Sequence, residues 1–138
     1  MTNDEITLHR GLAGVYFDRS ATTFIDGKEG VLEYRGYNIN ELAERSTFEE
    51  TAYLLIYGVL PTQAQLDDYN AELKGARELP EQIFDVIEIV KDAHPMDALR
   101  TAVSALSGFD PDRNDTSTEA AIRKGLRLTS QVPSIVMA

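Results

Sequence analysis

The segment from Asp26 to Leu42, which reads DGKEGVLEYRGYNINEL, constrains the fold most, because it joins a turn, a strand and a helix start. Asp26-Gly27 and Gly30 tolerate the positive φ that hairpin turns require. The four residues after Gly30 alternate in the way a short strand does. We therefore predict a hairpin that pairs Phe24-Ile25 with Leu32 to Tyr34.

Two short runs before the hairpin turn have the β-branched and aromatic composition of strands, and the second of them contains Phe24-Ile25. They are Gly14 to Phe17 and Thr22 to Ile25, and the turn residues Asp18-Arg19-Ser20 separate them. From Asn38 to the end of the chain the pattern is helical. The expected fold is therefore mainly α, with a small N-terminal β hairpin.

Helix starts are marked by an oxygen-bearing side chain three residues before an acid or amide, since such pairs satisfy backbone donors that the first turn leaves free. Pro80 suits the first position of another helix. Pro95 disfavours the helical conformation at His94, which places His94 just before a helix. The predicted capping pairs are Asn38 with Glu41, Ser46 with Glu49, Thr62 with Gln65, and Thr116 with Glu119.

The helices are expected to be amphipathic, because apolar residues recur three and four positions apart and so lie on one stripe. Each stripe needs a packing partner. Gly58, Gly75 and Gly108 mark helix ends or breaks, and residues 110–115 have the composition of a solvated loop. The three stripes are Ile83, Val86, Ile87 and Val90; Met96, Leu99, Val103 and Leu106; and Ile122, Leu126 and Thr129.

Composition excludes several classes of protein. The chain has 138 residues, of which 43% are hydrophobic, enough for the core of one domain. Its 23 acidic and 13 basic side chains give a net charge of −10, which repels nucleic acid and anionic membranes. It contains no cysteine, no secretory signal and no apolar run near the ~20 residues that span a bilayer. We therefore predict a soluble cytoplasmic protein without nucleic-acid or membrane partners.

His94 and Asp97 are candidates for proton transfer, and each also has a structural interpretation. A histidine acts as a general base only with a partner within reach, and one histidine cannot form a metal site alone. The position of His94 before Pro95 favours packing or capping. Asp97 lies in the first turn of the helix that follows, where it complements the helix dipole. We favour the structural interpretation at both positions.

Arg35 is a candidate for gripping a carboxylate with two hydrogen bonds. No second arginine lies nearby in the sequence to complete an anion site. We therefore favour a strand end at which Arg35 pairs with Glu33 or Glu41 and Gly36 turns the chain.

A second set of basic residues has the charge needed to hold the phosphates of a coenzyme. Arg123 and Arg127 share a helix face by their spacing of four, but a solvated charged face gives the same pattern, and we favour it. The adjacent acids Glu49-Glu50 and Asp67-Asp68 do not converge on one point and are interpreted as surface charge. The glycines before Tyr37 match no nucleotide-binding loop. The basic residues are Arg100, Arg123, Lys124 and Arg127.

An ordered set of segments resembles the citrate synthase family, in which we include the 2-methylcitrate synthases. The resemblance lies in the order and spacing of the whole set rather than in one motif. The segments are Gly11 to Val15, Phe24 to Gly27, Leu32 to Tyr37, Phe48 to Glu50, Tyr53 to Leu55 with Gly58, Leu60 to Thr62, Leu79-Pro80, His94 to Asp97, Leu99 to Leu106, and Pro133 to Val136.

This resemblance implies that residues 11–138 form the N-terminal portion of the multihelical large domain of that family, after a mobile arm at residues 1–10. Such enzymes are homodimers that condense acetyl-CoA, a substrate rather than a cofactor, with oxaloacetate to give citrate and CoA. Their two catalytic histidines and catalytic aspartate lie in motifs that no position here matches. The resemblance therefore assigns no catalytic, cofactor-binding or metal-binding residue, and it predicts that the chain alone is inactive.

The apolar C-terminal residues 131–138 suggest a fragment whose last helices expose surface that is covered in the complete enzyme. Exposed apolar helix faces favour association, and symmetric dimers are the commonest result. We therefore expect self-association, as a homodimer, through residues 95–107 and 118–138. The alternative is a non-catalytic helical scaffold or regulatory fragment that keeps the first half of the fold.

Overall fold

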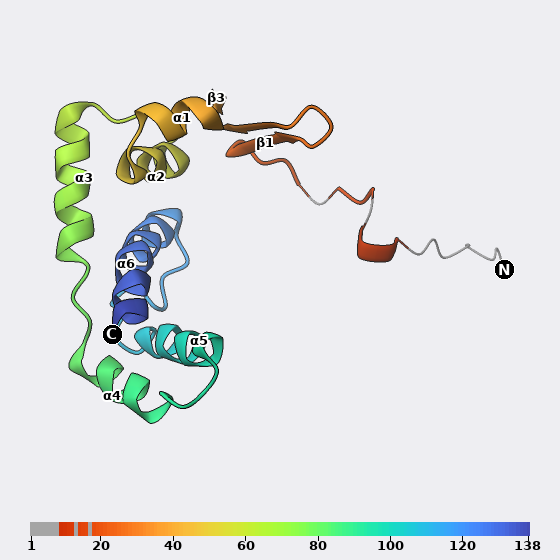
Figure 1. Ribbon diagram of the computed structural model, residues 1–138. Helices are drawn as coiled ribbons and strands as arrows, with labels where there is room; N and C mark the ends of the chain where they lie inside the picture. The colour runs from red at the N-terminus through yellow and green to blue at the C-terminus, as the bar shows by residue number, and fades with distance from the viewer. Residues whose placement is uncertain (1–8, 13, 17) are drawn as a thin grey trace.

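The computed structural model describes residues 9–12, 14–16 and 18–138, which form helices with a small sheet at one end (Figure 1). A short 3-10 turn, η1 (Arg10–Leu12), comes first. The strands are β1 (Thr23–Asp26), β2 (Val31–Tyr34) and β3 (Tyr37–Asn38). The helices are α1 (Ile39–Arg45), α2 (Phe48–Tyr57), α3 (Gln63–Gly75), α4 (Glu81–Ile89), α5 (Pro95–Leu106) and α6 (Thr118–Met137). The predicted mainly helical fold with an N-terminal hairpin is confirmed. Most of the predicted arm, residues 1–8, lies outside the described residues.

The sheet has three antiparallel strands in the order β1-β2-β3. Phe24 pairs with Glu33 and Ile25 with Leu32, which confirms the predicted hairpin. Gly30 supplies the positive φ of the hairpin turn, at 68°.

The third strand was not predicted. Arg35 and Gly36 both have a positive φ, of 51° and 85°, and reverse the chain so that Tyr37–Asn38 pairs back onto β2. The expected turn at Gly36 is confirmed. The short strand that follows leads directly into α1, so the sheet and the first helix are joined without a loop.

The strand predicted at Gly14 to Phe17 is wrong for the residues that the structure describes. Gly14 has a φ of 77°, and the backbone N–H of Val15 donates to the carbonyl of Leu12 at 3.0 Å. This hydrogen bond closes a turn after η1 instead of leaving an extended chain. Phe17 lies outside the described residues.

The helix caps follow the predicted chemistry, with shifts of one residue. Thr62 forms a full capping box with Gln65 at the start of α3, as predicted. Asn38 caps α1 as predicted, but its side chain accepts from the backbone N–H of Asn40, and α1 has no capping box with Glu41. The caps predicted at Ser46 and Thr116 are wrong by one residue, because the next residue in each case carries an equivalent hydroxyl. The observed caps are Thr47 for α2 and Ser117 for α6.

Glu50 and Pro80 also differ from their predicted roles. Glu50 completes the capping box of Thr47, so it is more than the surface charge that we expected. Pro80 is the cap of α4 rather than its first residue, and it offers no side-chain hydrogen bond there. The expected end of α2 at Gly58 is confirmed, with a left-handed φ of 84°.

Helix α6 lies between two groups of helices, since it contacts both α3 and α5, while α2 packs on α3 and α4 on α5 (Figure 1). The aliphatic cluster joins α4, α5 and α6, and the tyrosine cluster joins α2, α3 and α6. Most of the predicted stripe residues pack in these clusters, but Val86, Val90 and Thr129 belong to neither, and Met96 is 63% exposed. The aliphatic cluster is Leu79, Ile83, Ala102, Leu106 and Ile135; the tyrosine cluster is Tyr53, Tyr69, Leu73 and Leu126.

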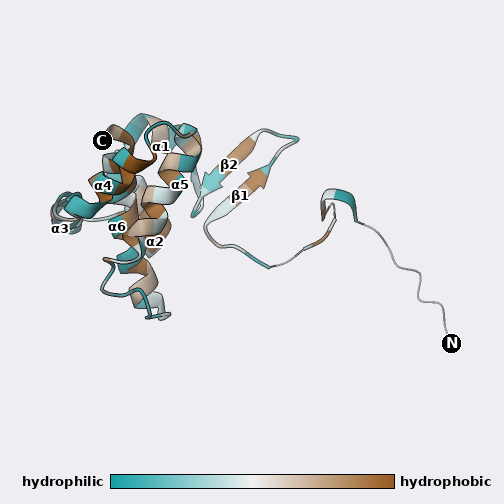
Figure 2. Ribbon diagram, turned by 90° about the horizontal axis from the view of Figure 1, so that it is seen from below, coloured by the Kyte–Doolittle hydropathy of each residue, from teal (hydrophilic) through white to brown (hydrophobic). Residues whose placement is uncertain are grey.

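The β1-β2 hairpin extends away from the helices (Figure 2). Its apolar residues Phe24 and Ile25 are largely exposed, at 57% and 69%. The hairpin therefore adds little to either cluster. Among the described residues, no helix combines the length and the apolar character that a membrane crossing requires.

Candidate functional site

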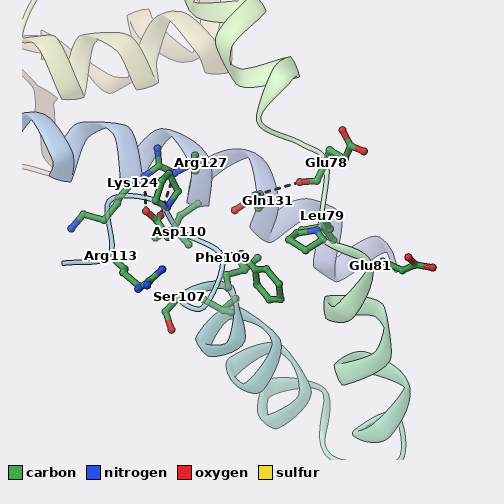
Figure 3. Close-up of a pocket in the computed structure, with 15 residues that line it drawn as sticks. Glu78, Leu79, Glu81, Ser107, Phe109, Asp110, Arg113, Lys124, Arg127 and Gln131 are labelled. Carbon is green, nitrogen blue, oxygen red and sulfur yellow. Dashed lines mark hydrogen bonds and ion pairs between the residues drawn. The ribbon is translucent and has the colours of Figure 1, made fainter. Parts of the chain in front are cut away.

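A cleft of about 610 Å³ lies between the start of α4, the end of α5 and the middle of α6 (Figure 3). Apolar and charged side chains line it in nearly equal number. The apolar lining consists of Leu79, Pro80, Val103, Leu106, Phe109, Pro111 and Leu128; the polar lining consists of Glu78, Glu81, Ser107, Asp110, Arg113, Lys124, Arg127 and Gln131.

The spacing of residues on α6 places its side chains in this cleft. Four residues of α6 that line the cleft are related by spacings of three and four, so they lie on one face of the helix. They are Lys124, Arg127, Leu128 and Gln131. The amide of Gln131 donates to the carbonyl of Glu78 at 3.4 Å, which joins α6 to the segment before α4.

Ion pairs connect the loop after α5 to α6. Arg127 donates to both oxygens of Asp110, at 2.8 and 3.2 Å, and to Asp112 at 2.7 Å. Arg123 binds the two oxygens of Asp112, at 2.7 and 3.0 Å. The side chains of Asp110 and Asp112 are only 18% and 17% exposed. Paired geometry of this kind is stronger than a single exposed ion pair.

The same contacts lower the pKa of the loop carboxylates. Hydrogen bonds from Arg123 and then from Arg127 hold the pKa of Asp112 far below its usual range. The pKa of Asp115 is also lowered, first by the backbone N–H of Ser117. Both groups are therefore fully ionised at neutral pH, and the network keeps its charge.

The basic side chains of α6 hold the loop after α5 in place rather than leaving a site for an anion. All three arginines that we considered for phosphate binding, Arg100, Arg123 and Arg127, are engaged with carboxylates. Lys124 donates to the backbone carbonyl of Asp115 at 2.6 Å. Arg113 also lines the cleft and forms no ion pair with the described residues. The expected solvated charged face is found at Arg100, whose side chain is 79% exposed, but not at Arg127, which is 23% exposed and bound to two carboxylates. Residues 110–115 form the expected loop, in which Asp110 and Asp112 are bound to α6 rather than solvated.

His94 and Asp97 have the structural roles that we favoured. The Nδ1 atom of His94 accepts from the backbone N–H of Met96 at 3.2 Å and so caps α5. Asp97 lies in the first turn of α5 and pairs with Arg100 at 3.1 Å, on an exposed surface. These residues do not lie together with the cleft at α6.

The predicted pairing of Arg35 with Glu33 or Glu41 is wrong. Its guanidinium instead donates to the carbonyl of Leu55 at 3.0 Å, at the C-terminal end of α2. Carbonyls at this end of a helix lack partners within the helix. The left-handed backbone of Arg35 turns the side chain toward α2, which no sequence pattern indicated.

A smaller cleft of about 340 Å³ lies where α2 and α3 meet α6. Ser130 lines it, is 6% exposed and has an Oγ atom without a hydrogen-bond partner among the described residues. The hydroxyl of Tyr69, in the tyrosine cluster, is also buried without a hydrogen-bond partner among the described residues. Within the described ranges, no group of three or more His, Asp or Glu side chains is placed to hold a metal ion.

Sequence reasoning missed the network between the loop and α6. The hydrogen-bonded partners are 9 to 17 residues apart, so no helical period links them. The available signal was the alternation of Asp110 and Asp112 shortly before two arginines on one helix face. That pattern predicts ion pairs only if the loop is already known to fold back on the helix.

Comparisons with known proteins agree on one family. The family described as "Citrate synthase, C-terminal domain" matches residues 11–138. A citrate synthase from Deinococcus radiodurans is 44% identical over 94% of the chain and 34% of its own length. A 2-methylcitrate synthase from Shewanella oneidensis is 42% identical over 91% of the chain and 33% of its own length.

The solved structures agree with the sequences. The crystal structure of citrate synthase from Pyrobaculum aerophilum superposes with a TM-score of 0.85 and 38% identity, covering 91% of the chain and 34% of that structure. The chain thus spans about a third of the length of the curated relatives that it matches. On sequence and on structure, this chain belongs to the citrate synthase family.

Proposed function

We propose that this chain is the N-terminal part of an enzyme that condenses acetyl-CoA with oxaloacetate to give citrate and CoA. The observation that carries the proposal is the 44% identity to a citrate synthase over 94% of the chain. The order of the resembling segments, from Gly11 to Ala138, supports a place at the start of the large domain. A cytoplasmic location is part of the proposal.

Within that enzyme the role of this chain is structural, and the chain alone is inactive. The condensation needs a base beside the thioester and a donor that steadies the enolate. The polar groups that come closest to these requirements are already engaged: His94 caps α5, Arg100 pairs with Asp97, and Arg127 holds the loop carboxylates. This engagement supports a scaffold that positions catalytic groups from elsewhere in the enzyme.

Two alternatives have support of their own. The 42% identity to a 2-methylcitrate synthase favours an enzyme that takes propionyl-CoA in place of acetyl-CoA. A non-catalytic scaffold or regulatory fragment is favoured by the structural use of His94 and the α6 arginines. The first alternative differs from the proposal in the acyl-CoA that the enzyme uses. The second differs in that the chain would support no activity, even as part of a complete enzyme.

A chimera tests the enzyme proposals directly. Residues 11–138 would replace the matching segment of the Deinococcus radiodurans citrate synthase, and oxaloacetate-dependent release of CoA would be measured with acetyl-CoA and with propionyl-CoA. We expect activity within about tenfold of the parent, because residues that only support a site change rates less than residues that react. A folded chimera without activity would contradict the proposal.

The isolated chain provides the matching control. The purified 138-residue chain, shown to be folded by circular dichroism, should release no CoA from either acyl-CoA in the presence of oxaloacetate. Release of CoA would overturn the structural role and direct attention back to His94 and Arg100.

Self-association through residues 95–107 and 118–138, as a homodimer, is part of the proposal. It is supported by the apolar residues that these segments expose, namely Met96 at 63%, Val136 at 64% and Met137 at 86%. We expect Met96→Glu to raise the dissociation constant by about tenfold or more, measured by sedimentation velocity, since a charge is costly in an apolar interface. Ile25→Glu, at 69% exposure on the hairpin, is the matched control. Equal effects of the two changes would exclude this interface.

A further inference from the structure

The loop at residues 109–117 joins α5 to α6 and forms one wall of the large cleft. Phe109, Asp110, Pro111 and Arg113 from this loop all line the cleft (Figure 3). The two hydrophobic clusters of the described residues include no residue of the loop, and Phe109 is 45% exposed. Burial of apolar surface therefore does little to hold the loop in place.

Charged contacts hold the loop to α6 instead. They consist of Asp110 with Arg127, Asp112 with both Arg123 and Arg127, a longer contact of 3.9 Å between Asp115 and Arg123, and the bond from Lys124 to the carbonyl of Asp115. Every one of these contacts ends on a basic side chain of α6. The attachment of this wall of the cleft to the helix is therefore mainly electrostatic.

The loop also has internal hydrogen bonds that do not involve α6. The backbone N–H of Arg113 donates to the carbonyl of Asp110 at 3.2 Å, and that of Asp115 donates to the carbonyl of Asp112 at 2.8 Å. The backbone N–H of Asp112 donates to the side chain of Asp110 at 2.7 Å. These bonds give the loop a shape that does not depend on its contacts with α6.

We propose that loop 109–117 is an electrostatic strap, which closes the large cleft while Asp110 and Asp112 bind Arg127 and Arg123, and which opens the cleft when these ion pairs are broken. The proposal concerns the conformation of the cleft and does not depend on the reaction of the complete enzyme. High ionic strength should favour the open form, because salt shortens the screening length from about 10 Å at 0.1 M to about 3 Å at 1 M.

The absence of cysteine from the sequence makes the opening measurable. Val103→Cys places a single thiol in the half-buried wall of the cleft, and Val86→Cys places one in a half-buried site on α4 outside it. The rate of labelling with an uncharged maleimide reports access to each site. Asp112→Asn weakens the strap, because it removes the charge that both Arg123 and Arg127 bind while the pair of Asp110 with Arg127 stays. Asp92→Asn removes the same charge at an exposed residue outside the loop.

We expect Asp112→Asn to speed labelling at Val103→Cys by about tenfold relative to Asp92→Asn, with little change at Val86→Cys, as for a local opening. Salt at about 1 M should speed labelling at Val103→Cys in the protein with an intact Asp112, and have a smaller effect in Asp112→Asn. Equal acceleration at both thiols would mean general loosening and would overturn the proposal, as would no acceleration at either. If Asp112→Asn fails to fold, the salt series with Asp112 intact decides the question alone.

Discussion

The aliphatic and tyrosine clusters share α6 but are stabilised differently. Ile83 and Ala102 in the aliphatic cluster are completely buried and contain no polar side-chain atom. In the tyrosine cluster the rings of Tyr53 and Tyr69 meet edge to face, with centroids 5.4 Å apart, while the hydroxyl of Tyr69 is buried without a partner. Close packing alone supports the first cluster, whereas the second combines favourable ring contacts with the cost of an unpaired polar group.

This difference predicts opposite signs for substitutions that remove atoms. Deletion of apolar atoms should destabilise either cluster, because it leaves a cavity. Deletion of the unpaired hydroxyl should leave stability unchanged or raise it, because no hydrogen bond is lost. The predictions below test that contrast from the largest expected effect to the smallest.

Ile83→Ala should have the largest effect, a loss of about 2–5 kcal/mol in the free energy of unfolding, because the side chain is completely buried. Urea denaturation measures it. Ile89→Ala makes the same chemical change on the same helix at a residue that is 82% exposed, and it should stay within about 0.5 kcal/mol of the parent. Similar losses at the two positions would show that the aliphatic cluster is not a close-packed core.

Thr62→Ala should cost about 1 kcal/mol, because it removes the hydroxyl of the capping box that begins α3. Thr62→Ser keeps the hydroxyl and should retain most of the stability. The effect belongs to the side of the molecule with the tyrosine cluster, because α3 contributes Tyr69 and Leu73 to it. Equal losses for the two variants would exclude the capping role.

These local features were largely predictable from the sequence. The capping pair at Thr62 and the apolar stripes of α4 and α5 depend on spacing within one helix, which the sequence displays directly. The error at Ser46 is of the same local kind. Ser46 with Glu49 and Thr47 with Glu50 are overlapping versions of one motif, and local chemistry does not choose between them. The structure selects Thr47.

The features that escaped prediction depend on contacts between distant residues. Arg35 donates to a backbone carbonyl 20 residues away, and every residue offers such a carbonyl, so the sequence cannot distinguish Leu55 as the partner. The ion pairs of Asp110 and Asp112 require the loop to fold back on α6. Both cases need a tertiary arrangement that local periodicity does not specify.

Tyr69→Phe should leave the free energy of unfolding unchanged or raise it by up to about 1 kcal/mol near neutral pH, because the deleted hydroxyl has no partner. Tyr53→Phe provides the comparison within the same cluster. A clear loss of stability in Tyr69→Phe would indicate that its hydroxyl has a hydrogen bond in solution.

The same variant should change the response to alkaline pH. Burial, followed by smaller effects of Tyr57 and nearby glutamates, raises the pKa of Tyr69 to about 12. Above its usual pKa of about 10, the unfolded state loses the phenolic proton while the folded state keeps it. The free energy of unfolding should therefore fall as the pH rises from about 10 to 12, and less steeply in Tyr69→Phe. Identical slopes would contradict the raised pKa.

Ser130→Ala should give the smallest effect, because two favourable contributions are each small. Ser130 is buried on α6 with an unpaired Oγ atom, and alanine also has a higher helix propensity by about 0.5 kcal/mol. Ser104→Ala isolates the propensity, since Ser104 is exposed on α5. The gain at Ser130 should exceed that at Ser104 by a few tenths of a kcal/mol, the share that comes from removing a buried unpaired hydroxyl. A smaller gain at Ser130 than at Ser104 would mean that this hydroxyl is bonded, and the contrast between the two sides of α6 would then rest on Tyr69 alone.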